Sequence, residues 1–168
     1  MPERADEGRQ PSVAIVGVGN ELMQDDGVGV HAVRRLQRVR LDPRALCIEA
    51  GTALAEALDL VPPGSHVLVV DAASGDGQPG SLYRYRLDDL AVERGVSLHE
   101  TSLPEAFALA QVAGTTLGDV VVLGVEPSVV AVGTELSPTI EERMPSILEA
   151  VQAEVARLLG NEPADGTR

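Results

Sequence analysis

The run Val13–Val30, VAIVGVGNELMQDDGVGV, constrains the fold of this chain more than any other segment. An apolar stretch breaks at a glycine-rich turn, presents the adjacent carboxylates Asp25 and Asp26, and continues with apolar residues at helical spacing. This strand, turn and helix are typical of an open α/β sheet, in which ligands bind in the crevice beyond the carboxyl ends of the strands. We therefore expect the two aspartates to lie at a functional rim of a sheet.

The composition agrees with a single α/β domain. The chain has 168 residues, of which 44% are hydrophobic and only 2% aromatic. Its core must therefore be built from Val, Leu, Ile and Ala, as in parallel sheets that are covered by helices. We expect one domain over residues 12–160, folded as a twisted, mostly parallel sheet with helices on both faces. The polar segments 1–11 and 161–168 are expected to be mobile ends.

The charge and the single cysteine exclude several classes of protein. The formal net charge is -13, which argues against a nucleic-acid partner. The chain contains no Lys, so it cannot have a P-loop lysine, a Schiff-base lysine or the lysine of a phospho-acceptor receiver domain. Cys47 has no second cysteine with which to form an intramolecular disulfide, and no apolar run approaches the length of a membrane span. We expect a cytoplasmic monomer with no membrane contact.

Hydrophobic periodicity divides the chain into alternating strands and helices. Buried strands are predicted at residues 12–18, 44–49, 65–71 and 119–125, and helices at 28–39, 54–60, 104–112 and 138–159. Residues 81–87 alternate with a period of two, which predicts a strand at the sheet edge, antiparallel to its neighbour. The last helix is expected to begin after Ser137, with Pro145 as an irregularity or a break.

Two aspartates and one histidine are candidate metal ligands. If the strands are parallel, Asp26 and Asp71 share one rim of the sheet, and His99 can join them. Two carboxylates and an imidazole with open positions suit Zn, Ni, Mn or Fe. From the spacing alone, the more ordinary interpretation is favoured: Asp26 belongs to a helix cap, Asp71 ends a strand, and His99 is a surface histidine. A dinucleotide site is disfavoured because Leu22 stands where GxGxxG requires its third glycine.

Five segments, taken together and in order, resemble the hydrogenase maturation proteases, the endopeptidases that complete the large subunit of nickel-iron hydrogenases. They are GVGNELMQDDGVGVHAVRRL, EAGTA, HVLVVDAAS, SLHETSLPEAFALA and VLGVEP. The resemblance implies an aspartic or metal-dependent endopeptidase, a peptide hydrolase that removes the C-terminal extension of the large-subunit precursor after nickel insertion. Nickel is then supplied by the substrate and serves for recognition, although other divalent cations can occupy the site.

The resemblance also assigns roles by position. Asp26, Asp71 and His99 match the family's metal ligands and act in catalysis through the metal, Asp25 is a neighbour that tunes the site, and Gly51 with Thr52 forms a wall of the substrate cleft. The chain departs from the family pattern at Gln24, where many similar sequences have Gly, and in the segment HETSLPEA. An alternative is a non-catalytic nickel-binding chaperone of the large subunit.

Overall fold

A computed structural model of the chain describes residues 12–90, 97–98 and 103–160, with the backbone alone for residues 97 and 98. The two predicted mobile ends, 1–11 and 161–168, and the candidate ligand His99 lie outside the described residues. The elements are, in chain order, β1 (Val13–Val18), the 3-10 helix η1 (Gln24–Gly27), α1 (Val28–Leu36), β2 (Ala45–Gly51), α2 (Leu54–Leu58), β3 (His66–Ser74), β4 (Leu82–Arg86), α3 (Leu87–Leu90), β5 (Ser97–Leu98), α4 (Leu103–Val112), β6 (Val120–Val125) and α5 (Pro138–Leu158).

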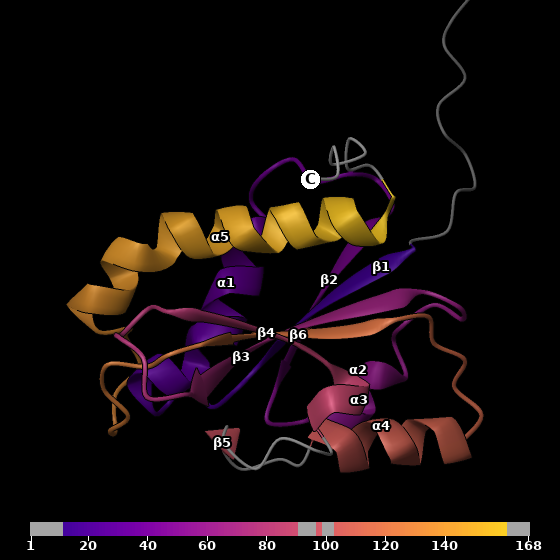
Figure 1. Cartoon of the computed structure of the whole chain (residues 1–168), viewed down its shortest axis with the longest axis horizontal. Helices are drawn as coiled ribbons and strands as arrows, with labels where there is room; N and C mark the ends of the chain where they lie inside the picture. The colour runs from indigo at the N-terminus through magenta and orange to yellow at the C-terminus, as the bar shows by residue number, and fades with distance from the viewer. Residues whose placement is uncertain (1–11, 91–96, 99–102, 161–168) are drawn as a thin grey trace, which may run out of the picture.

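The strands form one sheet in the order β2-β1-β3-β6-β4, with β5 beside the end of β3. β2, β1, β3 and β6 run parallel, so their carboxyl ends meet at one rim, on the left of Figure 1. β4 is antiparallel to β6 and lies at the edge, as the alternation of residues 81–87 predicted. The predicted class, a single α/β domain with a mostly parallel sheet and one antiparallel edge strand, is confirmed.

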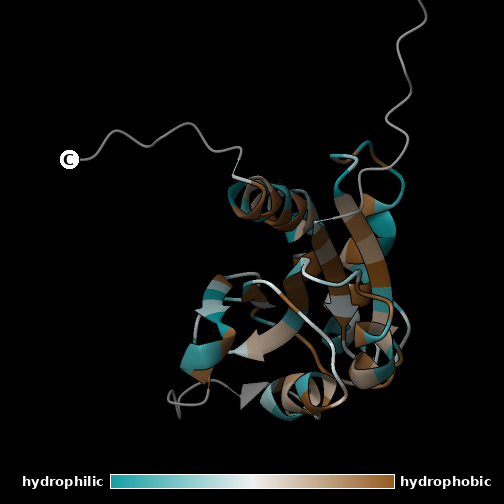
Figure 2. Ribbon diagram, turned by 90° about the vertical axis from the view of Figure 1, so that its right-hand side faces the viewer, coloured by the Kyte–Doolittle hydropathy of each residue, from teal (hydrophilic) through white to brown (hydrophobic). Residues whose placement is uncertain are grey.

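Helices cover both faces of the sheet. α1 and α5 lie on one face, and α2, α3 and α4 lie on the other (Figure 1). The central strands β1, β3 and β6 can be apolar along almost their whole length because neither of their faces meets water, and every residue of β1 is buried. Figure 2 shows this apolar layer in brown between the helices. Each fully buried Val or Leu contributes about 1.5–3 kcal/mol to the free energy of unfolding. Many such residues can therefore stabilise a core that contains almost no aromatic side chains.

Element boundaries differ from the sequence predictions where tertiary contacts intervene. β3 continues to Ser74, three residues past Asp71, because β5 pairs antiparallel with Ala73 and Ser74. Neither β5 nor α3 was predicted; α3 begins at the last residue of the strand predicted at 81–87, and β5 lies between α3 and the helix predicted at 104–112. α1 ends at Leu36 because the next apolar residue, Val39, is exposed and adds nothing to the buried face.

The last helix begins where it was predicted to begin, and Pro145 does not break it. α5 follows Ser137, whose Oγ accepts a hydrogen bond from the backbone N–H of Ile140, and continues through Pro145 as one helix. Over the part of the chain that the structure describes, no helix has both the length and the apolar character needed to cross a membrane.

Candidate active site

Asp26 is presented by the turn that connects β1 to α1. It lies on η1 and is only 6% exposed, so its carboxylate is largely removed from solvent. Oδ2 accepts a hydrogen bond of 2.9 Å from the backbone N–H of Asn20. Oδ1 is buried and has no hydrogen-bond partner. A buried carboxylate oxygen without a partner carries a large desolvation cost, which makes it a strong candidate for binding a cation.

Asp71 brings a second carboxylate to the same rim from β3. Its side chain is 2% exposed, and its Oδ1 accepts the backbone N–H of Ala72 at 2.8 Å. The pKa of Asp71 is raised from 3.8 to about 7: burial is the main cause, the Ala72 N–H lowers the pKa, and the charge of Asp26 contributes to raising it. The carboxyl group of Asp71 therefore changes protonation near neutral pH.

Gly19 lies between the two aspartates. Its φ is +123°, and a Cβ atom at this position would lie 1.9 Å from the backbone oxygen of Asp26 and 3.5 Å from Oδ1 of Asp71. The close approach therefore requires glycine. β1 and β3 are neighbours although β2 comes between them in the chain, so this is a topological switch point, where open α/β sheets bind ligands.

The two carboxylates at this rim fit a divalent cation. Asp26 offers an unpartnered oxygen, Asp71 supplies a second buried carboxylate beside it, and carboxylate oxygens are ligands for divalent metals. Within the described residues, which exclude His99, no three His, Cys, Asp or Glu side chains are grouped to hold a metal ion. Leu98, the residue before His99, pairs with Ala73, two positions beyond Asp71.

The carboxylate of Asp25 has different partners, although Asp25 adjoins Asp26 in η1. It is fully buried, and its two oxygens accept hydrogen bonds from the loop that joins β6 to α5, residues 126–137. The donors are the backbone N–H groups of Ser128, Val129 and Ser137 and the hydroxyl of Ser137, at 2.7–2.9 Å. We call Asp26 and Asp71 the acid pair. Any effect of Asp25 on the acid pair is therefore exerted through the turn and not by direct contact.

Gly51 and Thr52 line a cleft of about 420 Å³ beside the turn that carries Asp26. Gly19 and Asn20 belong to the same lining, so the cleft is continuous with the turn that carries Asp26. The N–H of Gly19 donates to the carbonyl of Gly51 at 2.9 Å, which ties the end of β2 to this turn. The remaining lining residues are Glu21, Leu22, Val30, Arg34, Glu49 and Ala50.

Arg34 is a cleft residue that the sequence analysis did not identify. The amphipathic pattern of residues 28–39 predicts only that Arg34 faces solvent. In the structure its guanidinium binds Glu21 at 3.0 Å and Glu49 at 2.9 Å, and these ion pairs raise its pKa. Two sequence signals could have placed these residues at the cleft. Val30 and Arg34 are one helical turn apart and so share a face of the helix, and Glu49 and Gly51 are two positions apart and so share a face of the strand. The cleft thus holds a fixed positive charge flanked by two carboxylates.

Gln24 holds a backbone conformation that favours glycine. Its φ is +51°, in the left-handed region, and its side chain packs against Gly133. We expect Gln24→Gly to be more stable than Gln24→Ala by about 1 kcal/mol, because Ala keeps the left-handed strain while both variants lose the side chain. Urea unfolding of the two variants measures the difference, and an Ala variant as stable as the Gly variant would contradict the strain.

Comparison with known proteins agrees with this geometry. The family model described as hydrogenase maturation protease matches residues 30–154. The hydrogenase expression/formation protein HupD of Thiocapsa roseopersicina is 31% identical over 144 residues, covering 83% of this chain and 65% of HupD. A putative hydrogenase maturation protease of Methanocaldococcus jannaschii is 30% identical over 151 residues, covering 89% and 90%.

The solved structures include a similar fold. The hydrogenase maturating endopeptidase HybD from E. coli superposes with a TM-score of 0.73 at 26% identity, covering 86% of this chain and 92% of HybD. The match spans only 57–65% of the length of several HupD, HoxM and HupM relatives. The family model nevertheless extends over most of the domain, from α1 to α5. This chain therefore belongs to the hydrogenase maturation protease family.

Proposed function

We propose that this chain is an endopeptidase that removes the C-terminal extension from the large-subunit precursor of a nickel-iron hydrogenase once nickel has been inserted. The observation that carries the proposal is the pair Asp26 and Asp71, two buried carboxylates brought to one rim, one of them with an unpartnered oxygen. The adjoining cleft provides room for an extended peptide. Membership of the family supplies the substrate class.

Asp26, Asp71 and His99 are the proposed ligands for the nickel that the substrate carries. Asn20 holds one oxygen of Asp26, which leaves the other free to bind. A cation bound here would favour the ionised form of Asp71, because it would offset the burial and the charge of Asp26 that raise the pKa of this carboxyl group. The placement of Leu98 beside Ala73 supports His99 as the third ligand. The bound metal supplies Lewis acidity toward the scissile carbonyl or a water molecule.

The cysteine of this chain does not fit the role of a nucleophile. Burial raises the pKa of Cys47 to about 11, so its thiol is protonated at neutral pH. Cys47 lies within β2, in register with Ile15 of β1, and not at the rim where Asp26 and Asp71 lie. The rim acids and the cleft, with Gly51 and Thr52 as a wall that positions the peptide, therefore carry the proposed reaction.

The test is a processing assay with nickel-loaded and nickel-free precursor. The wild-type protein should shorten only the loaded precursor, as measured by mass spectrometry. Asp26→Asn and His99→Ala should fold normally and lower the processing rate about a hundredfold or more, because each removes a metal ligand. Asp59→Asn makes the same charge change as Asp26→Asn at an exposed position and should leave processing unchanged.

Two outcomes would overturn the proposal. Normal processing by Asp26→Asn or His99→Ala would remove the ligands from the reaction. Binding of the loaded precursor without any shortening would instead favour the nickel-binding chaperone, which recognises the same substrate and does not cut it.

A further inference from the structure

Asp25 joins the turn that carries Asp26 to the loop of residues 126–137. Four hydrogen bonds from this loop converge on its carboxylate: Oδ1 accepts the N–H of Ser137, and Oδ2 accepts the N–H groups of Ser128 and Val129 and the hydroxyl of Ser137. The side chain has no exposed surface. A carboxylate is buried at this cost only where its hydrogen bonds are complete, so its geometry is tightly determined.

The main chain links the same two segments at Asp25 and at the residues just before it. The N–H of Asp25 donates to the carbonyl of Val129 at 3.1 Å, and the N–H of Gln24 donates to the carbonyl of Gly133 at 2.9 Å. The N–H of Gly133 donates in turn to the carbonyl of Leu22, a residue of the cleft. The turn and the loop are thus hydrogen-bonded from Leu22 to Asp25, immediately before Asp26.

We propose that Asp25 is a positioning residue, which fixes the turn against the 126–137 loop and thereby directs the carboxylate of Asp26 toward Asp71. This inference rests on the proposed function only for its effect on processing. The adjacent peptide carries the effect, because rotation of the turn about residue 25 displaces residue 26. The hydrogen bond from Asn20 to Asp26 is the first contact that such a rotation would break.

Asp25→Asn is the most informative change. It keeps the volume of the side chain but replaces one acceptor oxygen by an NH₂ group, which faces N–H donors whichever way the amide is turned. We expect a 10- to 100-fold fall in kcat on nickel-loaded precursor with a smaller change in KM, because supporting residues of a metal site act at this level. We also expect the amide resonance of Asn20 to move in the metal-free protein, since its acceptor moves.

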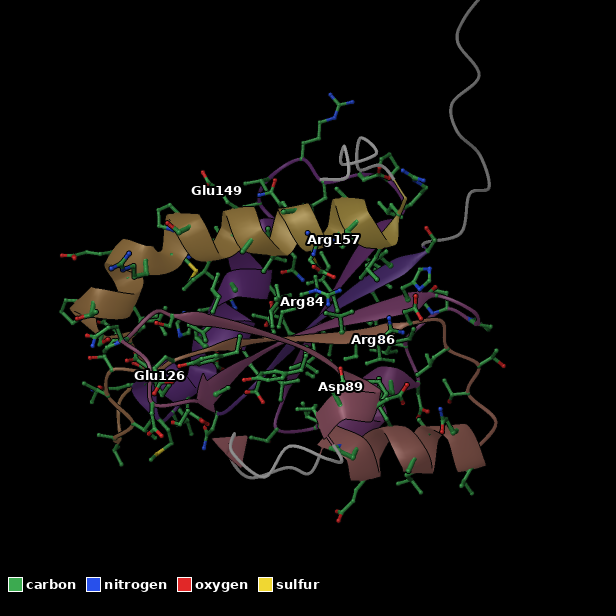
Figure 3. The ribbon with its side chains drawn as sticks, viewed as in Figure 1. Arg84, Arg86, Asp89, Glu126, Glu149 and Arg157 are labelled. Atoms are coloured by element: carbon green, nitrogen blue, oxygen red, sulfur yellow. The ribbon has the colours of Figure 1, made fainter. Side chains whose placement is uncertain are left out.

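Glu154→Gln is the matched control, because it alters another carboxylate that is almost fully buried. Glu154 binds Arg84 of β4 and Arg157 of its own helix, two residues that Figure 3 shows between α5 and the sheet, apart from Glu126 at the start of the loop. Glu154→Gln should lower the melting temperature while leaving the Asn20 resonance and kcat in place. A structural role for Asp25 would likewise lower only the melting temperature.

The Asn20 resonance separates this inference from the proposed function, because it needs neither metal nor precursor. A folded Asp25→Asn protein with an unmoved Asn20 resonance and normal kcat would overturn the positioning role, as would an equal movement in Glu154→Gln. If Asp25→Asn does not fold, Ser137→Ala is tested instead, by the Asn20 amide resonance and by kcat. This variant removes one of the four donors to Asp25 and retains the other three. A wild-type protein that fails to process the loaded precursor would count against the proposed function alone.

Discussion

Asp71→Asn should make the metal-free protein more stable at pH 8 while abolishing its processing of precursor. The pKa of Asp71 is 3.8 in the unfolded chain and about 7 in the folded protein, chiefly because of burial. Between these values the folded protein retains a proton that the unfolded chain has lost, so the free energy of unfolding decreases as the pH rises. Above about pH 7 both states are ionised, and the loss is complete.

The size of the effect follows from the same two values. At about 1.4 kcal/mol per pH unit, the ionised Asp71 lowers the free energy of unfolding by up to about 4 kcal/mol at pH 8. Asn has the size of Asp but no charge, and its amide oxygen can still accept the N–H of Ala72. We therefore expect an increase in melting temperature of roughly 10 °C at pH 8. The advantage should shrink toward zero near pH 4.

Urea and thermal unfolding at pH 4 and pH 8, with EDTA present, measure this prediction. Asp59→Asn is the control, because an exposed aspartate should change the stability by less than about 0.5 kcal/mol at either pH. An Asp71→Asn protein that is less stable than the wild type at pH 8 would show that Asp71 is not a buried, destabilising charge. The processing assay is read separately, because the proposed function and not the burial of Asp71 predicts its result.

Gly19→Ala should lower the free energy of unfolding by about 3 kcal/mol or more and displace Asp26. The new Cβ would lie 1.9 Å from the backbone oxygen of Asp26, so the turn must shift by more than an ångström to admit it. The left-handed backbone at φ +123° adds strain that glycine avoids. Urea unfolding measures the loss of stability, and the amide resonance of Asn20 reports the displacement of Asp26.

Gly64→Ala separates the steric cost from the backbone strain. Gly64 also has a positive φ, +78°, but a Cβ there meets nothing within 4 Å. We expect this control to lose only about 1 kcal/mol. Similar losses in the two variants would mean that the contact between Gly19 and Asp26 is not tight, and the acid pair could then tolerate movement of the turn.

Both predictions describe a site that reduces the stability of the fold. A buried Asp71 near Asp26 is destabilising without a cation, and a turn that admits only glycine at residue 19 offers little tolerance to substitution. Such costs are typical of functional sites, where the arrangement that serves chemistry differs from the one that maximises stability. Stability measurements without metal therefore give evidence about the site that is independent of any assay with precursor.

Much of the fold could be predicted from the sequence because its signals are local. The apolar run before Gly19 can be buried on both faces only in a covered parallel sheet, and the alternation at residues 81–87 requires an edge. Once the strands are parallel, their carboxyl ends meet, which is why Asp26 and Asp71 could be expected at one rim. The third candidate ligand, His99, stays a prediction, because it lies outside the described residues.

Other features of the site depend on pairs that are distant in sequence. Nothing near Asp25 indicates that its donors come from residues more than a hundred positions away. Spacing along α1 and β2 can place Arg34 and Glu49 on faces near the cleft, but it does not show that they form an ion pair, nor that Glu21 joins them. Likewise, β3 extends past Asp71 only because β5 returns to pair with it. Hydrophobic periodicity is silent on these contacts because it records which face of an element is buried, not which residue lies opposite.

The sequence by itself determined the α/β class, the order of the apolar strands and the two acids that follow them. These features depend on hydrophobic periodicity and on turn residues, which involve only residues close together in the sequence. Only the tertiary structure decided the charge state of Asp71, the partners of Asp25 and the cleft beside Gly51. Those properties arise from desolvation and from hydrogen bonds between distant segments, and both exist only after the chain has packed.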